Sequence, residues 1–234
     1  MSETGAGEPP RSRVDDGPRK PGREPIEESP SGERRRRVSV VQTIDHGAVL
    51  RETRRAIFLD RDGTLIRDVG YPKDPDKVEL LTGVAMALRT AHNVQMAVIV
   101  VSNQSGIARG LLTTADYEAV RKRMHELLAE FGAFVDGEYF CPHHPEFTGP
   151  CDCRKPALAL YERAIVEHGI EPSESAFIGD RWRDVAPASH YAGLGILVPS
   201  SKTPPEDIAH AESSARVVST LKQAIDMAIA NRPA

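Results

Sequence analysis

The sequence contains little cysteine, few aromatic residues and no long apolar run. Three of its 234 residues are cysteines, and aromatic residues make up 5%. No stretch approaches the roughly 18 to 20 apolar residues that a membrane span requires, and the N-terminus has no apolar run of signal-peptide length. We therefore expect a soluble, cytoplasmic protein with no membrane partner.

The net charge is also small, at -4 with histidine counted as neutral. Because charges of both signs are mixed along the chain, the composition gives no general reason to expect a nucleic-acid partner. The basic run Arg34–Arg37 is favoured as a solvated charge run over a nucleic-acid-binding arm. It lies within residues 1–54, which we expect to form a disordered tail because they contain few large apolar side chains to bury.

Residues 55–234 are long enough for one domain with a sizeable core. Short apolar runs at 56–59, 94–101, 137–140, 175–179 and 194–198 predict buried strands, and helical patterns begin near Thr82, Thr113, Pro156 and Ser219. The helical stripe after Thr113, which runs from Val120 to Phe131, is assigned to the core. This alternation predicts an α/β fold, a doubly wound and mostly parallel sheet, and we expect a monomer.

Two carboxylates, Asp60 and Asp62, follow the first predicted strand directly. Side chains in an extended segment alternate with a period of two, so this pair begins on the same side of the backbone. Two like charges at close range favour either a bound divalent cation or a shared proton. The alternative is an ordinary turn, since Asp and Gly are common turn residues.

Polar groups also follow two other predicted strands, at Ser102 and Asp180. Ligands bind doubly wound sheets at the carboxyl ends of the strands, where Asp60, Ser102 and Asp180 should lie together. Carboxylates at Asp60, Asp62 and Asp180 would suit Mg²⁺. Asp184 is a weaker candidate because it suits a helix surface or a cap equally well. The loop after Ser102 can face an anion or form an ordinary strand-to-helix turn.

All three cysteines lie close together, at Cys141, Cys151 and Cys153, with His143 beside the first. An odd number of clustered cysteines favours a metal site over a disulfide framework and indicates a reducing compartment. Three thiolates and one imidazole make a closed tetrahedral zinc site, which leaves no position for water and is therefore structural. His144 is the alternative fourth ligand, although a surface histidine is the favoured interpretation.

Arg154 and Lys155 come directly after the last predicted zinc ligand. A metal-bound loop would fix their backbone and hold two cations near one place, which favours anion binding over a solvated basic pair.

These residues, in order, resemble the four motifs of the haloacid dehalogenase-like (HAD) phosphohydrolases: Asp60-Arg61-Asp62-Gly63-Thr64, Ser102, Lys155 and Gly179-Asp180. Within that family, residues 58–65, 102–110, 141–145 and 151–156 look very like the D-glycero-D-manno-heptose 1,7-bisphosphate 7-phosphatases. The resemblance covers about residues 56–199. Histidinol-phosphate phosphatases are similar in the same motifs and are the alternative.

The resemblance implies a Rossmann-type HAD fold with a small zinc loop and little or no cap domain. It implies that Asp60 attacks phosphorus, that Asp62 transfers protons, and that Ser102 and Lys155 bind the phosphoryl oxygens. Mg²⁺ would be held by Asp60, Asp62 and Asp180. Residues expected to contact a sugar bisphosphate substrate are Asp68, Tyr71, Asn103, Gln104, Ser105, Arg109, Arg154 and Arg181.

Two departures from the heptose enzymes leave the substrate and its anomer open. Arg181 stands where those enzymes commonly have lysine, and the stretch between His143 and Cys151 is shorter. A different class of function, an idle zinc module that holds nucleic acid through its basic arm, is disfavoured because Asp60, Asp62, Lys155 and Asp180 are all present.

Overall fold

The computed structural model describes residues 53–231, and within them six strands form one parallel sheet. The strands are β1 (Ala56–Leu59), β2 (Ala97–Asn103), β3 (Gly137–Cys141), β4 (Ala176–Gly179), β5 (Leu194–Leu197) and β6 (Arg216–Val217). Their order across the sheet is β3-β2-β1-β4-β5-β6, with every pair parallel. The predicted doubly wound α/β fold is confirmed. The predicted tail lies outside the described residues, apart from Thr53 and Arg54.

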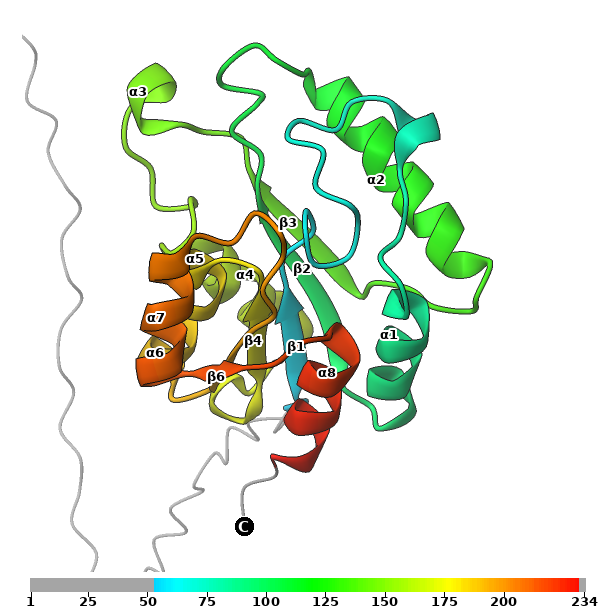
Figure 1. Ribbon diagram of the computed structural model, residues 1–234, viewed down its shortest axis with the longest axis vertical. Coiled ribbons are helices and arrows are strands. Elements are labelled where there is room, and N and C mark those ends of the chain that lie inside the picture. Colours follow the sequence, from blue (N-terminus) through cyan, green and yellow to red (C-terminus); the bar gives the residue numbers. More distant parts are fainter. Residues whose placement is uncertain (1–52, 232–234) are drawn as a thin grey trace, which may run out of the picture. The chain divides into compact units, whose positions relative to one another are not determined.

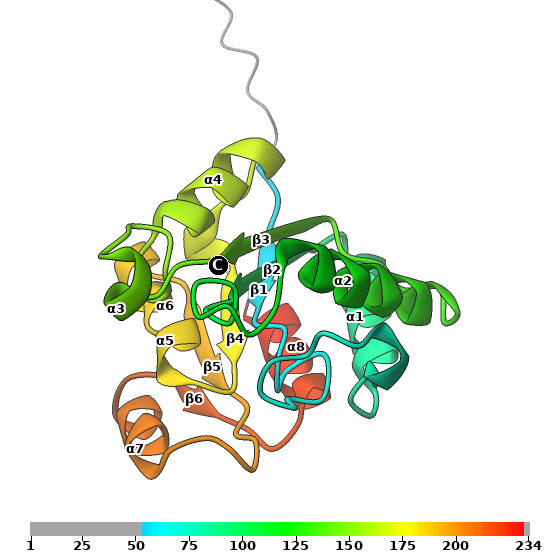
Figure 2. The same ribbon diagram turned by 90° about the horizontal axis from the view of Figure 1, so that it is seen from above.

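Helices cover both faces of the sheet (Figures 1 and 2). On one side lie α1 (Val84–Asn93), α2 (Thr114–Ala129) and α8 (Leu221–Ala230). On the other lie α4 (Ala159–His168), α5 (Trp182–Val185), α6 (Pro187–Tyr191) and α7 (Pro205–Ser214), while the short α3 (Pro145–Thr148) belongs to a loop above the sheet. Single turns of 3-10 helix occur at Pro75–Lys77 and Pro172–Glu174. None of the helices in residues 53–231 is long and apolar enough to cross a membrane.

The core is divided by the alternation of side chains along β1. Ile57 and Leu59 pack into the cluster that contains α1 and α8, whereas Ala56 and Phe58 pack into the cluster on the α4 side. All four are buried, as expected for a central strand of a parallel sheet. The sequence of β1 is therefore continuously apolar because neither face meets water.

The strand order reverses at the junction of β1 with β4, which places their carboxyl ends at the topological switch point. Asp60 follows β1 and Asp180 follows β4, and the backbone N–H of Asp60 donates to the carbonyl of Ile178. Two acids that are 120 positions apart in sequence thus meet at the edge where such sheets bind ligands.

Two predicted helix starts are confirmed by their caps. Thr113 forms a capping box with Asp116 at the start of α2, which satisfies two backbone N–H groups that the helix leaves open. Gly83 caps α1 with a φ of 82°, a conformation that costs glycine little.

Three predictions of detail are wrong. The apolar run from Val94 does not begin a strand there, because Val94 caps the end of α1 and the strand β2 starts at Ala97. Pro156 does not start a helix; a turn separates it from α4, which begins at Ala159. Phe131 is 56% exposed, not in the core, because α2 ends at Ala129.

Candidate active site and metal centre

The centre of the site is a buried lysine between two carboxylates. Lys155 Nζ lies 2.6 Å from Asp60 Oδ1 and 2.7 Å from Asp184 Oδ1, and all three residues are buried. Oxygens of Asp60, Asp180 and Asp184 lie within 4.8 Å of one another. The structure therefore brings together Asp60, Asp180 and Lys155 as expected, and it places Asp184 fully among them.

The charge of this cluster leaves room for a cation. Burial, followed by the charges of Asp60 and Asp184, raises the pKa of Asp180 to about 6. Burial lowers the pKa of Lys155, but the charges of Asp184 and Asp60 outweigh it and the net shift is upward. Lys155 thus pairs with two of the three carboxylates, Asp60 and Asp184, and oxygen donors at this spacing fit a hard divalent cation such as Mg²⁺.

Gly63 allows the loop after β1 to approach Asp180. Its φ is +92°, and a Cβ built on it would lie 2.5 Å from Asp180 Oδ2. Any side chain there would therefore displace a proposed metal ligand. On the other side, Ser200 Oγ donates a hydrogen bond of 2.7 Å to the same carboxylate.

The Asp62 carboxylate is held by two buried neighbours. Arg61 Nη2 lies 2.9 Å from Asp62 Oδ2, and Gln104 Nε2 donates to the same oxygen at 2.8 Å. Gln104 was expected to contact substrate; it lines the pocket, but its amide is engaged with Asp62 and Arg61.

A cavity of about 290 Å³ opens above these acids. Of the residues expected to contact substrate, those that line it are Asp68, Tyr71, Asn103, Gln104, Ser105, Arg154 and Arg181. Asn103 also fixes the zinc-side loop, because its amide exchanges hydrogen bonds with the backbone N–H and carbonyl of Lys155 at 3.0 and 3.1 Å.

Arg183 also lines this cavity, and the sequence interpretation missed it. Its Nε lies 3.9 Å from Asp184 Oδ1. Arg183 lies in α5, two residues after Arg181 and three after Asp180, the acid at the end of β4. This short distance from two predicted site residues is the signal that could have identified it.

Two predicted residues are placed differently from the rest. Ser102 is fully buried, and its hydroxyl has no hydrogen-bond partner among residues 53–231. Arg109 does not line the cavity; its guanidinium contacts His144 Nε2 at 2.7 Å and lies 5.3 Å from the centre of the Phe147 ring.

The second cluster consists of Cys141, His143, Cys151 and Cys153, whose ligand atoms lie within 4.8 Å of one another. Cys141 Sγ is 3.7 Å from Cys151 Sγ and 3.0 Å from Cys153 Sγ, and His143 Nδ1 is 3.2 Å from Cys153 Sγ. Three sulfurs and one imidazole nitrogen gathered this closely are the donor set of a structural zinc site, so the chemistry of the cluster fits that ion. All three cysteines are free thiols, and His144 instead caps α3.

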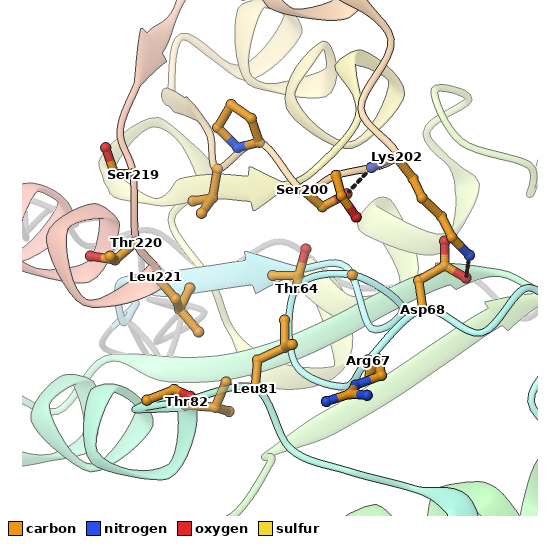
Figure 3. Close-up of a pocket in the computed structure, with 15 residues that line it drawn as sticks. Thr64, Arg67, Asp68, Leu81, Thr82, Ser200, Lys202, Ser219, Thr220 and Leu221 are labelled. Carbon is orange, nitrogen blue, oxygen red and sulfur yellow. Dashed lines mark hydrogen bonds and ion pairs between the residues drawn. The ribbon is translucent and has the colours of Figure 1, made fainter.

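A neighbouring cavity of about 340 Å³ lies between the start of α8 and the loops at Arg67 and Ser200 (Figure 3). The ion pair of Lys202 with Asp68, at 3.1 Å, stands between the two cavities, since Asp68 lines both. The smaller cavity is the candidate active site because it alone of the two meets the acid cluster and the arginines.

Comparisons with known proteins agree with this geometry. Residues 152–224 match the HAD-hydrolase-like family model. The D-glycero-beta-D-manno-heptose-1,7-bisphosphate 7-phosphatase of Haemophilus ducreyi is 39% identical over 150 residues, which cover 62% of this chain and 82% of that protein. The protein of the same name from Escherichia coli O6:H1 is 41% identical over 153 residues, covering 63% and 80%.

Solved structures give the same result. The D,D-heptose 1,7-bisphosphate phosphatase of B. bronchiseptica, complexed with magnesium and phosphate, has a TM-score of 0.67 and 29% identity, covering 76% of this chain and 99% of that one. A putative HAD-like phosphatase of Mesorhizobium loti has a TM-score of 0.62 and 31% identity, covering 75% and 88%.

Proposed function

Because the chain belongs to the HAD-like phosphatases, in the group of the heptose 1,7-bisphosphate 7-phosphatases, we propose that it removes the 7-phosphate from a D-glycero-D-manno-heptose 1,7-bisphosphate. It is a hydrolase of phosphoric monoesters. The reaction would take place in the cytoplasm, where three free thiols are kept reduced.

The reaction divides between the two acids that follow β1. A carboxylate oxygen of Asp60 attacks phosphorus, and the bond from phosphorus to the substrate alcohol breaks while Asp62 protonates the departing oxygen. Asp62 then takes a proton from water, which attacks the aspartyl-phosphate. The bond between phosphorus and Asp60 breaks, and the products are inorganic phosphate and the free carboxylate.

The surrounding groups stabilise charge in both steps. Lys155 lies against Asp60 and, with the Ser102 hydroxyl, would meet the phosphoryl oxygens, where one well-placed donor contributes on the order of 2.7 to 4 kcal/mol. Asp60, Asp180, Asp184 and the backbone carbonyl of Asp62 would hold Mg²⁺. When bound, the ion neutralises repulsion between the carboxylates and the anionic phosphate.

The observation that carries the bisphosphate assignment is the set of arginines that share the cavity with the acids. Arg154, Arg181 and Arg183 all line the cavity with Asp60, Asp62 and Asp180. Arginine is suited to phosphate because its planar fork donates two parallel hydrogen bonds. A substrate with a second phosphate would place one at Asp60 and the other among these arginines.

A substrate panel tests this proposal. Turnover of the α and β anomers of heptose 1,7-bisphosphate is measured beside histidinol phosphate, which carries a single phosphate and an amine. We expect at least one heptose anomer to exceed histidinol phosphate in kcat/KM by about 100-fold or more, the scale of two lost charge-assisted hydrogen bonds. Faster turnover of histidinol phosphate would overturn the heptose assignment and leave the hydrolase mechanism standing.

We also propose that the cysteine cluster holds a structural zinc ion, and two adjacent histidines allow a matched test. His143→Ala removes a ligand and should lose most of the metal, whereas His144→Ala should retain about one zinc per chain. Because Arg154 and Lys155 follow the cluster, activity should fall with the metal in the first variant. Zinc content and the thermal midpoint are measured for both. Equal zinc in the two variants would contradict this ligand set.

A further inference from the structure

Arg61 is the largest fully buried side chain in residues 53–231, and it sits between the two catalytic acids in sequence. Its guanidinium approaches both oxygens of Asp62, with Nη2 at 2.9 and 3.1 Å and Nε at 3.3 Å from each. Nη2 also donates to Gln104 Oε1 at 3.1 Å. The Asp62 side chain itself is 19% exposed and reaches the cavity.

Gln104 closes a triangle with this pair. Its Oε1 accepts from Arg61 while its Nε2 donates to Asp62 Oδ2, so the two faces of the amide match a cation and an anion and fix its orientation. The Gln104 backbone N–H donates to the carbonyl of Cys141 at 2.7 Å, which attaches the triangle to the end of β3.

Helix α2 supports the far side of the guanidinium. The Arg61 guanidinium carbon lies 5.0 Å from the centre of the Tyr117 ring, and the Tyr117 hydroxyl donates to Glu138 at 3.1 Å. The Glu138 side chain is 2% exposed and also contacts Arg121 and His125, both on α2. Burial lowers the pKa of Arg61, but Asp62, Tyr117 and Glu138 outweigh it, so the cation is retained.

Stability does not account for this arrangement. Arg61 Nη1 is buried and has no hydrogen-bond partner in the described part of the chain, which costs free energy. Replacing a buried ion pair by well-packed apolar residues is often neutral or stabilising, so a charged residue here needs another reason. What the triangle does achieve is one fixed position for the Asp62 carboxylate.

We propose that Arg61 and Gln104 are positioning residues that hold the Asp62 carboxylate in the orientation from which it protonates the departing alcohol. The inference rests on the acid role of Asp62 in the proposed function. General acid catalysis requires the acid within hydrogen-bond reach of the oxygen it protonates, and a rotated carboxylate loses that reach. Arg61 does not line the cavity, and the Gln104 amide is engaged by Arg61 and Asp62.

The test separates leaving groups that need a proton from one that does not. Single-turnover release of product is measured with the best alkyl phosphate of the substrate panel and with p-nitrophenyl phosphate, for Arg61→Lys and Gln104→Leu. We expect alkyl phosphate cleavage to fall about 10- to 100-fold, part of the 10²- to 10⁴-fold that acid–base catalysis supplies, and p-nitrophenol release to change less than about threefold. Lysine keeps the charge but lacks the planar fork.

Two further variants define the outcomes. Arg163→Gln, which alters an exposed arginine paired with Glu167, should leave both rates unchanged. Asp62→Asn should show the selective loss more strongly than either positioning variant. If Asp62→Asn shows the selective loss, then equal losses for the two substrates, or no loss, in Arg61→Lys and Gln104→Leu would overturn the proposal. If Asp62→Asn itself lacks selectivity, the proposed role of Asp62 fails. Because Gln104→Leu removes no charge, it still tests the proposal if Arg61→Lys folds poorly.

Discussion

Asp60→Asn should abolish turnover, with kcat lower by about 10⁴-fold or more, and leave the fold intact. An amide oxygen is a far weaker nucleophile than a carboxylate, and loss of a covalent nucleophile costs on this scale. The fold should survive because Lys155 keeps its ion pair with Asp184 at 2.7 Å. Steady-state turnover of the heptose bisphosphate and the thermal midpoint are the measurements.

Two controls make that result specific. Asp226→Asn, which alters a surface acid paired with Lys222, should retain full activity. Acid-quenched wild-type enzyme should carry covalent phosphate after mixing with substrate, whereas Asp60→Asn should not. Normal turnover in Asp60→Asn, or covalent phosphate that persists in it, would contradict Asp60 as the nucleophile.

Much of the fold could be predicted because its signals are local. Buried strands of a parallel sheet are apolar on both faces, so β1 and β4 stand out as short runs that end in an acid. The rule that ligands bind at the carboxyl ends of strands then brings Asp60 and Asp180 together without knowledge of any contact. The sheet order confirms this, since β1 and β4 are neighbours.

The elements that the sequence does not predict show weaker signals. Helix α7 buries only Ala211, so its sequence shows no apolar stripe, although Pro205 with Glu206 and Asp207 in the first turn is a helix-start signal. Strand β6 has two residues, both exposed, and shows no pattern. The displaced start of β2 follows from the end of α1, because a run of apolar residues does not reveal which of them cap a helix.

The partners of the site residues depend on tertiary contacts that the sequence pattern does not contain. The family resemblance implies Gln104 as a substrate contact, but its amide is engaged by Arg61 and Asp62. Asp184 resembled a cap as much as a ligand, and it serves as a cap too, because the Arg181 backbone N–H donates to it at 3.1 Å. Its place beside Lys155 depends on α5 meeting the loop before α4 in space.

Lys155→Met should lower both stability and activity, because it removes the fully buried cation that pairs with two buried acids. The side chain is fully buried and contacts Asp60 and Asp184, so methionine leaves both carboxylates without their short ion pair to Lys155. Removing one partner of a buried ion pair costs about 3 to 5 kcal/mol in the free energy of unfolding. Denaturant unfolding measures this loss. Activity should fall by about 10² to 10³-fold, since a phosphoryl contact disappears as well.

A second substitution separates the two effects. Asp184→Asn in the Lys155→Met background removes one uncompensated charge and should restore part of the lost stability, but it should restore no activity, because the phosphoryl contact of Lys155 remains absent. Lys222→Met, at an exposed ion pair with Asp226, should change the free energy of unfolding by less than about 1 kcal/mol. If Lys155→Met were as stable as Lys222→Met, the acid cluster would not depend on this lysine for its charge balance. If the double variant recovered activity with stability, Lys155 would act only through the fold.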